Sequence, residues 1–197
     1  MTGLKILLAE DESAVAASIA EQVRSLGHEV VAEAETGREA VEQALDARPD
    51  LVVMDIKMPD GDGIEAACRM AAERPVPVVF LSGHYDKELL SGVVESGGLA
   101  YLLKPATSDQ LQAALMLAYR RFHDMQDLRE QALRLEAALE SRKLIARAKG
   151  LLMERHGIGE KEAHRRMQKE ASRSNMKLAD LASAILAAES FVGEPEG

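Results

Sequence analysis

The 197-residue sequence predicts an α/β protein: a doubly wound, five-stranded parallel sheet, followed by a coiled-coil helix and a small three-helix bundle. Two observations predict the sheet. Five short apolar runs alternate with helical segments over residues 4–103, and several runs are almost continuously apolar, as strands covered on both faces are. Right-handed crossovers between such strands favour the order 2-1-3-4-5. The helices are predicted because apolar residues take up a helical spacing after the last run.

Local signals set the bounds of the strands and helices in the first part. Gly27 marks the end of the first helix, since glycine just past a helix adopts the left-handed conformation easily. The Lys104–Pro105 bond is a candidate for cis geometry, because X-Pro bonds favour trans by only about 0.5–1 kcal/mol. Strands are expected over 4–9, 29–34, 50–54, 77–81 and 100–103, with Ser13 as the first N-cap and later helices opening at Thr36 or Gly37 and at Asp62 or Gly63.

Polar side chains stand where the predicted strands end. Glu10 and Asp11 follow the first strand, Asp55 the third, Ser82 the fourth and Lys104 the fifth. The carboxyl ends of parallel strands form the ligand crevice of an open α/β sheet, so these side chains are expected to converge on one site. That site would hold a divalent cation and a phosphoryl group.

The chemistry of these residue types supports this expectation. Mg²⁺ prefers oxygen ligands and keeps several waters, so Glu10, Asp11 and Asp55 suit it. With the cation bound, Asp55 can act as the nucleophile towards phosphorus and form an aspartyl phosphate. Lys104 would pair with one phosphoryl oxygen, and the Ser82 hydroxyl would donate to another.

Four motifs at these positions resemble those of response-regulator receiver domains. They are "LLAEDES", "LVVMDIKMPDGDG", "VVFLSG" and "AYLLKP", and the resemblance covers residues 3 to about 119. It implies a flavodoxin-like receiver domain over 1–119 and a sensor histidine kinase as partner. It also implies that Asp55 is the phosphoacceptor, that Asp11 and the Lys57 carbonyl bind Mg²⁺ directly with Glu10 acting through water, and that Ser82, Tyr101 and Lys104 form the switch.

Apolar residues after the sheet recur in steps of three and four. This pattern is typical of a coiled-coil seam, with one three-residue slip between Met125 and Leu128. It predicts a homodimer through residues 115–139, with 120–140 as the linker helix. The alternative is a single amphipathic helix folded back on its own domain. The seam comprises Leu115, Ala118, Phe122, Met125, Leu128, Ala132, Leu135 and Leu139.

Charge divides the chain into two unlike parts. Residues 1–119 carry 9 Lys and Arg against 20 Asp and Glu, a net charge of −11, whereas residues 141–180 carry 11 against 5, a net charge of +6. An acidic domain is repelled from nucleic acid, while a compact basic segment gains from the release of phosphate counterions. The second part is therefore a candidate nucleic-acid binder.

The segment "SRKLIARAKGLLMERHGIGEKEAHRRMQKEASRSNMKLADLA", residues 141–182, resembles the ANTAR family of RNA-binding antiterminator domains. The resemblance implies an ANTAR domain over 141–191 that binds RNA stem-loops of a leader transcript. Aromatic residues are scarce here, so contacts from Lys and Arg to backbone and shape should dominate. Residues 192–197 are expected to be a disordered tail. The candidate RNA contacts are Arg142, Arg147, Lys149, Arg166, Arg173 and Lys177.

Two other output functions stay open: a helix-turn-helix regulator that reads duplex DNA, and a protein-interaction arm of a phosphorelay without nucleic-acid binding. An enzymatic output is not expected, because no catalytic triad, Cys/His cluster or glycine-rich phosphate loop follows Pro105. No secretory or membrane-spanning segment is recognised, and the single cysteine fits the cytoplasm. Cys68 itself is expected on a buried helix face.

Overall fold

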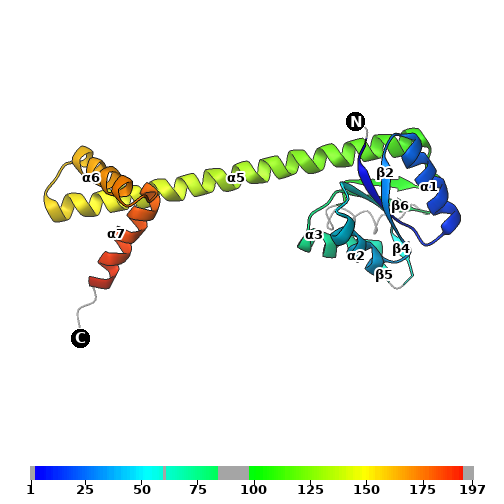
Figure 1. Cartoon of the computed structure of the whole chain (residues 1–197), viewed down its shortest axis with the longest axis horizontal. Coiled ribbons are helices and arrows are strands. Elements are labelled where there is room, and N and C mark those ends of the chain that lie inside the picture. Colours follow the sequence, from blue (N-terminus) through cyan, green and yellow to red (C-terminus); the bar gives the residue numbers. More distant parts are fainter. Residues whose placement is uncertain (1–2, 60, 84–97, 193–197) are drawn as a thin grey trace. The chain divides into compact units, whose positions relative to one another are not determined.

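The computed structural model describes residues 3–59, 61–83 and 98–192 (Figure 1). The chain forms two compact units, Met1–Asp127 and Leu128–Gly197. Among the helices of the described ranges, none combines the length and the apolar character that crossing a bilayer requires.

The first unit is built on a five-stranded parallel sheet in the order β2-β1-β3-β6-β7. This order confirms the predicted 2-1-3-4-5 arrangement. A short antiparallel hairpin, β4–β5, was not predicted and lies in the loop after β3. The elements are β1 (Lys5–Ala9), α1 (Ser13–Ser25), β2 (Glu29–Ala34), α2 (Gly37–Ala47), β3 (Leu51–Asp55), β4 (Lys57–Met58), β5 (Gly61–Asp62), α3 (Gly63–Glu73), β6 (Val78–Ser82) and β7 (Ala100–Leu103).

Helix starts agree with the sequence for α2 and α3 and differ for α1. The Thr36 side chain accepts a hydrogen bond from the Glu39 amide, and Asp62 accepts one from Ile64. Ser13 was wrongly expected as the N-cap of α1: Glu12 takes that position, and its side chain makes no capping bond. The Lys104–Pro105 bond is cis, as the sequence suggested.

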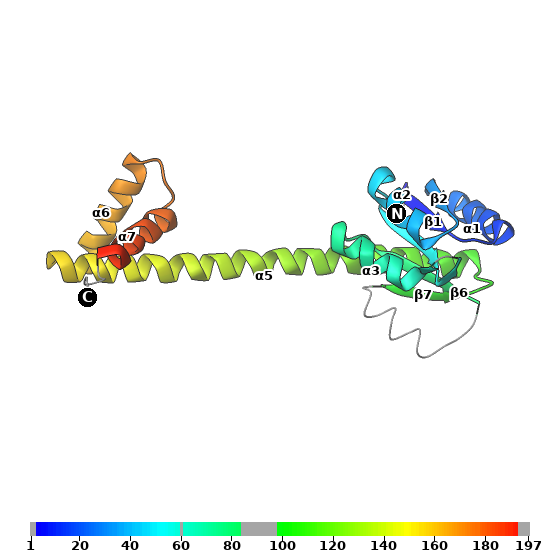
Figure 2. The ribbon, with the colours of Figure 1, turned by 90° about the horizontal axis from the view of Figure 1, so that it is seen from below.

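Helices lie on both faces of the sheet (Figure 2). An apolar layer fills the space between the sheet and the helices on each face. Helices α2 and α3 cover one face, where Phe80 and Met54 are completely buried. Helix α1 and the start of α5 (Ser108–His156) cover the other. Every residue of β3 and β6 is buried, which explains why these two runs are the most apolar.

The N-terminal part of α5 belongs to the core of the first unit. Leu115 and Ala118 are completely buried against the sheet face that α1 also covers. These two positions were wrongly included in the coiled-coil seam, because their helical spacing serves packing on the sheet. Further along, the seam is exposed: Met125 and Leu128 are 60% and 64% accessible, and Leu135 is 67% accessible.

The second unit is a three-helix arrangement around a small core, which confirms the predicted bundle. The end of α5 packs with α6 (Glu160–Arg173) and α7 (Leu178–Val192) around Ala148, Met167 and Ala182. Helix α7 begins at Leu178, and Asn175 adopts a left-handed conformation in the turn before it. Most of the expected tail, residues 193–197, lies outside the described residues.

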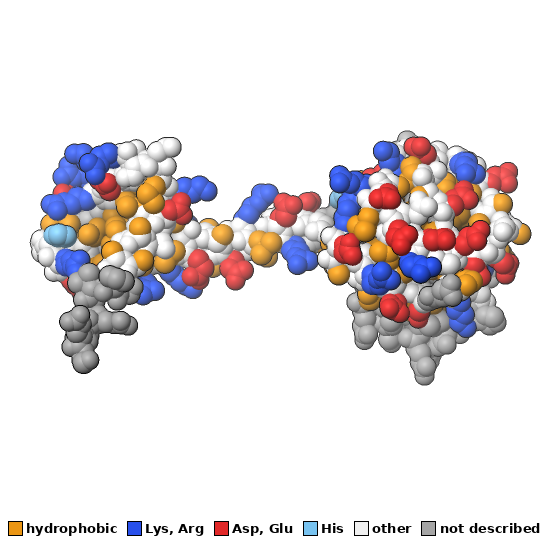
Figure 3. Space-filling model, turned by 60° about the horizontal axis from the view of Figure 1, so that its bottom comes forward, with side chains coloured by type: hydrophobic (Ala, Val, Ile, Leu, Met, Phe, Trp, Pro, Cys, Tyr) orange, Lys and Arg blue, Asp and Glu red, His pale blue; other side chains and the backbone are white. Residues whose placement is uncertain are grey.

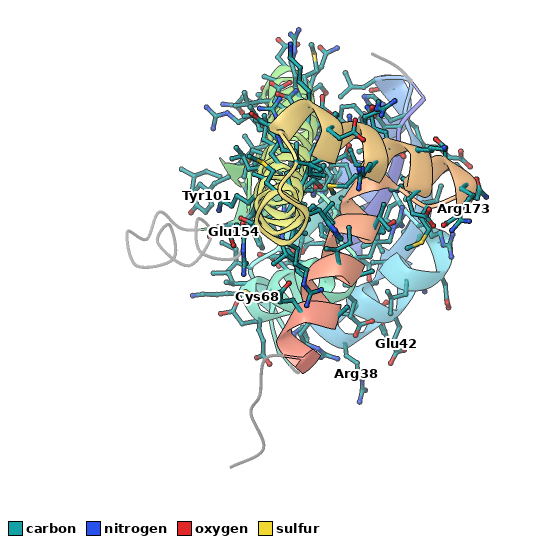
Figure 4. The ribbon with its side chains drawn as sticks, turned by 90° about the vertical axis from the view of Figure 1, so that its left-hand side faces the viewer. Arg38, Glu42, Cys68, Tyr101, Glu154 and Arg173 are labelled. Atoms are coloured by element: carbon teal, nitrogen blue, oxygen red, sulfur yellow. The ribbon has the colours of Figure 1, made fainter. Side chains whose placement is uncertain are left out.

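Figure 4 marks three exposed side chains of the first unit, Arg38 and Glu42 on α2 and Cys68 on α3. The expectation that Cys68 is buried was wrong. The buried face of α3 is formed instead by Ala66, Ala67 and Met70. The sequence does not specify the rotation of α3 about its axis to within one residue, and a rotation by one residue buries Ala67 and exposes Cys68 instead.

Protonation of His28 should destabilise the first unit. His28 is buried, and its Nδ1 accepts a hydrogen bond of 3.3 Å from the Leu4 amide, so the neutral ring is required. Burial lowers the pKa of His28 below the ordinary 6.5. The stabilisation by neutral His28 is therefore complete above pH 6.5, the ordinary pKa, and is lost as the pH falls through the lower folded-state pKa.

This effect is measured by urea unfolding at neutral pH and at about pH 5. In the wild type, the urea midpoint should fall between neutral pH and the acidic condition. His28→Gln should reduce this fall, because Gln keeps an acceptor that does not titrate in this range. His123→Gln, a change at an exposed position, should keep the wild-type fall. An equal pH response in wild type and His28→Gln would contradict the prediction.

Candidate functional site

The carboxyl ends of four parallel strands bring the predicted site residues together. Glu10 follows β1, Asp55 ends β3, Ser82 ends β6 and Lys104 follows β7. Register places Asp55 opposite Leu81 and Ser82 opposite Leu103, so the strand ends are level. They border an open cleft of about 660 Å³ that Asp11, Asp55, Lys57, Ser82 and Lys104 help to line.

Lys104 bridges two carboxylates at the base of this cleft. Its Nζ lies 2.5 Å from Glu10 Oε2 and 2.5 Å from Asp55 Oδ2. The side chains of Lys104, Glu10 and Asp55 are 18%, 0% and 11% accessible, so the three charges are largely removed from water. Buried charges are tolerated only when they are paired, and here one cation serves two anions.

The pKa directions follow from this burial and pairing. Burial raises the pKa of Glu10, and Lys104 opposes the rise only in part. For Lys104, burial alone would lower the pKa, but the hydrogen bonds to Asp55 and Glu10 outweigh it and raise the pKa above the ordinary value. The ammonium therefore stays charged over the whole physiological range.

The donor set fits a hard divalent cation. One carboxylate oxygen from each of Glu10, Asp11 and Asp55 lies within 4.8 Å of the others. Asp11 is exposed, whereas Glu10 and Asp55 are buried, so the cluster opens to solvent on one side. The Lys57 amide donates to Asp55 Oδ1 at 3.2 Å, and Lys57 lines the same cleft. Acidic oxygens with one side open to water are the surroundings that Mg²⁺ prefers.

The predicted switch residues occupy different depths of the site. Ser82 is buried at the end of β6, and its carbonyl oxygen accepts a 2.8 Å hydrogen bond from the Lys104 amide. Tyr101 lies on β7 opposite Phe80, is partly buried, and packs on the sheet face covered by α2 and α3. A backbone hydrogen bond thus joins Ser82 to Lys104. Tyr101 is not among the residues that line the cleft.

Gly63 supports the phosphoacceptor loop and was missed as a site residue. Its amide donates to the Ile56 carbonyl at 2.8 Å, and a Cβ on it would overlap the carbonyl oxygen of Asp55. The backbones of α3 and of the loop after β3 therefore approach as closely as only glycine allows. The glycine-rich segment 61–63 was the signal in the sequence, but it was interpreted only as a turn and a helix start.

The predicted RNA contacts do not share one environment. Arg142 and Arg147 are exposed on α5. Arg166 and Arg173 are exposed on α6 and pair with glutamates of the same helix, Glu162 and Glu170. Such exposed pairs contribute little to stability and exchange readily for other anions.

Lys149 and Lys177 differ from the arginines. The Lys149 side chain is only 20% accessible and pairs with Glu160 at 2.5 Å, joining α5 to the first turn of α6. This pair lowers the pKa of Glu160 through its hydrogen bond and charge. Lys177 is exposed in the turn before α7 and lines a separate hollow with Gln168 and Asn175.

Hydrophobic side chains gather on one face of the second unit, with Lys and Arg side chains around them (Figure 3). Arg166 and Arg173 line a groove of the second unit together with Lys169, which was not among the predicted contacts. Helical spacing in the sequence could have identified Lys169, since positions 166, 169 and 173 fall on one face of α6.

Comparison with known proteins gives two family matches. The model of the response regulator receiver domain matches residues 6–116, and the model of the ANTAR domain matches residues 133–186. The transcriptional regulatory protein PdtaR of Mycobacterium tuberculosis is 40% identical over 182 residues, which cover 92% of this chain and 89% of the relative.

Two further similar proteins match a shorter part of the chain. The chemotaxis protein CheY of Listeria monocytogenes is 34% identical over 113 residues, covering 57% of this chain and 95% of that protein. Among solved structures, the receiver domain of a modulated diguanylate cyclase from Desulfovibrio desulfuricans G20 superposes with a TM-score of 0.58 at 32% identity. The match covers 61% of this chain and 97% of that one.

Replacing Gly63 by alanine should damage the site by forcing the Asp55 loop away from α3. Overpacking against backbone typically costs about 1–3 kcal/mol, so the free energy of unfolding should fall by about that amount. Affinity for Mg²⁺, followed by titration of the purified chain, should fall as well.

Gly83→Ala is the matched control, since a Cβ at Gly83 meets no atom of the described residues within 4 Å. It should leave both the unfolding midpoint and Mg²⁺ affinity close to wild type. Equal behaviour of the two variants would show that the close approach at Gly63 is not required.

Proposed function

The chain belongs to the response regulator family, with a receiver domain followed by an ANTAR domain, and we propose that phosphorylation of Asp55 controls its binding to structured RNA. Both matched domains are regulatory, and the PdtaR relative is a transcriptional regulator. The observation that carries the proposal is the contact of Lys104 with Asp55 and Glu10 at 2.5 Å, inside a cluster of three carboxylates.

The proposed chemical step is transfer of a phosphoryl group to Asp55. An Asp55 carboxylate oxygen attacks phosphorus on the phosphohistidine of a sensor kinase, and the bond from phosphorus to the histidine nitrogen breaks. Glu10, Asp11, Asp55 and the Lys57 carbonyl would hold Mg²⁺, which offsets the negative charge of the incoming group. Lys104, already charged and 2.5 Å from Asp55, is placed to pair with a phosphoryl oxygen.

The proposed switch follows from a change of partners. Phosphorylation adds about −1.5 to −2 charge at Asp55, so Lys104 gains a stronger partner than the carboxylate it now contacts. The Ser82 hydroxyl can donate to a second phosphoryl oxygen. The Lys104 amide donates to the Ser82 carbonyl. The new phosphoryl contacts of Lys104 and of Ser82 would therefore both act on the ends of β6 and β7, and Tyr101 on β7 responds.

The proposed output is antitermination of transcription through RNA stem-loops. The basic segment 141–180, the exposed arginines of α5 and α6, and the ANTAR match support it. We assign residues 1–119 to the receiver, 120–140 to the linker helix and 141–191 to the RNA-binding domain. The site of action would be the cytoplasm, where kinase and transcript are both available.

A homodimer is part of the proposal, and its contact is the exposed part of the seam. Met125, Leu128, Leu135 and Leu139 are 54–67% accessible, an unusual exposure for large apolar side chains spaced at three and four residues. Pairing these residues with a second copy would remove them from water. Leu115 and Ala118 take no part, because the sheet covers them.

Replacing Asp55 by asparagine should abolish phosphorylation and the gain in RNA affinity. The amide oxygen is a poor nucleophile and the charge is lost, so a small phosphodonor with Mg²⁺ should add no phosphate, as measured by intact mass. Binding to a leader RNA hairpin should then be the same with and without the donor.

Asp62→Asn provides the control, because Asp62 caps α3 in the same loop and asparagine retains the cap oxygen. This variant should be phosphorylated like wild type. A duplex DNA of the same length should bind more weakly than the hairpin. Equal RNA affinity of phosphorylated wild type and Asp55→Asn would refute the switch.

Introducing a charge into the seam should separate the dimer. Leu135→Glu places two like charges in one apolar layer, and each buried leucine contributes about 1.5–3 kcal/mol. The expected result in sedimentation velocity is a shift from dimer to monomer. Leu133→Glu is the matched control, since Leu133 is 58% accessible on the same helix but off the seam. Dissociation by both variants would reject the predicted seam.

A further inference from the structure

We propose that Lys149 is a positioning residue of the second unit: its ion pair with Glu160 fixes the direction of α6 relative to α5, and Lys149 itself does not contact RNA. The inference rests on the proposed RNA binding and gives a different role to one residue that the sequence had placed among the RNA contacts. Lys149 Nζ lies 2.5 Å from Glu160 Oε1, and the two residues are 11 positions apart on different helices.

Lys149 is far less accessible than the other paired cations of this unit. Its side chain is 20% accessible, whereas those of the other Lys and Arg residues in ion pairs of the described residues 128–192 are 54–78% accessible. A lysine can cover its long apolar stem and still bring its ammonium to a partner. Lys149 therefore offers a phosphate little surface, and Glu160 already occupies its ammonium.

The Lys149–Glu160 pair also differs from its neighbours in what it connects. Every other ion pair of the described residues 128–192 links positions three or four apart within one helix. Such a pair lies along one helix surface and does not change the direction of that helix. A pair between two helices restrains their relative orientation. The hydrogen bond from Lys149 also lowers the pKa of Glu160, so the carboxylate stays ionised at neutral pH.

The turn between the two helices restrains α6 only weakly. It consists of residues 157–159 (Figure 1). Gly157 has a φ of +62°, and Gly159 is the N-cap of α6 without a capping side chain. A Cβ at either glycine would meet no atom of the described residues within 4 Å, so close packing does not hold them. Since glycine allows many backbone conformations, a restraint on Glu160, the first residue of α6, acts where the turn leaves most freedom.

The core holds α6 without specifying its direction closely. The buried residues of this helix are Ala163, Met167 and Ala171. Alanine has no side chain that could interlock with a neighbour, and methionine is unbranched and adapts to different surroundings. The ion pair at the start of α6 therefore supplies a directional contact that the apolar core lacks.

The direction of α6 sets the spacing between two groups of exposed cations. Arg142 and Arg147 are exposed on α5, and Arg166 and Arg173 are exposed on α6. Arg173 projects outward at the end of α6 (Figure 4). The phosphates of a folded RNA lie at fixed positions, so cations that are already held at a matching spacing bind them at a lower cost in ordering. Loss of the Lys149–Glu160 pair would release that spacing.

The test uses Glu160→Gln and Lys149→Gln in the full-length protein, treated with a small phosphodonor and Mg²⁺. Binding of a leader RNA hairpin is measured by fluorescence anisotropy. Both variants should lose about tenfold in affinity, and the variant with both changes should lose no more than either one, because all three lack the same pair. Glu160→Gln is the decisive variant: it removes a negative charge, so charge alone would make RNA bind more tightly.

Glu162→Gln is the matched control. Glu162 lies on the same helix and pairs with Arg165 at 2.7 Å and with Arg166 at 2.9 Å, both within α6. Its replacement removes the same charge without affecting a contact between helices. This variant should bind the hairpin as well as wild type or more tightly.

An exchange of the two charges tests the pair directly. Lys149→Glu and Glu160→Lys, each by itself, place like charges together and should weaken binding at least as much as the glutamine variants. The two changes combined restore an opposite pair, and affinity should return to within about twofold of wild type. A residue that contacts phosphate could not be rescued in this way, because the combined variant has an acidic residue at position 149. Circular dichroism under the assay conditions should show the wild-type helical signal in every variant.

Three results would overturn the inference and leave RNA binding in place. The first is wild-type or tighter binding by Glu160→Gln, and the second is a charge exchange that restores no affinity. The third is a loss of affinity that parallels a loss of helical signal, since the pair would then serve stability alone. Failure of phosphorylated wild type to bind the hairpin would instead reject the proposed function, and the role of Lys149 with it.

Discussion

The contact of one ammonium with two buried carboxylates organises the first unit. Lys104 lies between Glu10 and Asp55, and burial makes each charge costly unless it is paired. Parallel strands bring these residues together, because β1, β3 and β7 all end at the same edge of the sheet. In the proposed switch, a change of charge at Asp55 changes the partner of Lys104, whose amide donates to the carbonyl of Ser82.

The sheet also determines which part of α5 is available to partners. Leu111, Leu115 and Ala118 complete the core beneath the strands, so this part of the helix is held by burial. From Met125 to Leu139 the apolar side chains are exposed. One continuous helical spacing thus covers two environments, a part that packs on the sheet and an exposed part that the proposed dimer would use, and only the presence of the sheet separates them.

The second unit is held together with few large side chains. Its buried centre consists of Ala148, Met167 and Ala182, surrounded by partly buried leucines and isoleucines. Five of its Lys and Arg side chains pair with a glutamate of their own helix, and such exposed pairs can exchange partners with a polyanion. Lys149 is the exception, since its pair with Glu160 joins two helices and fits a structural role.

The sequence by itself determined the sheet order, the positions of Glu10, Asp55, Ser82 and Lys104 at strand ends, and the division into acidic and basic units. These follow from periodicity, handedness of crossovers and composition, which are local properties or general rules. Only the tertiary structure decided that Leu115 faces a sheet, that Cys68 is exposed, and that Arg166 and Lys169 border an apolar groove. Each of those depends on the rotation of a helix about its axis and on neighbours distant in the chain, which spacing along the sequence does not specify.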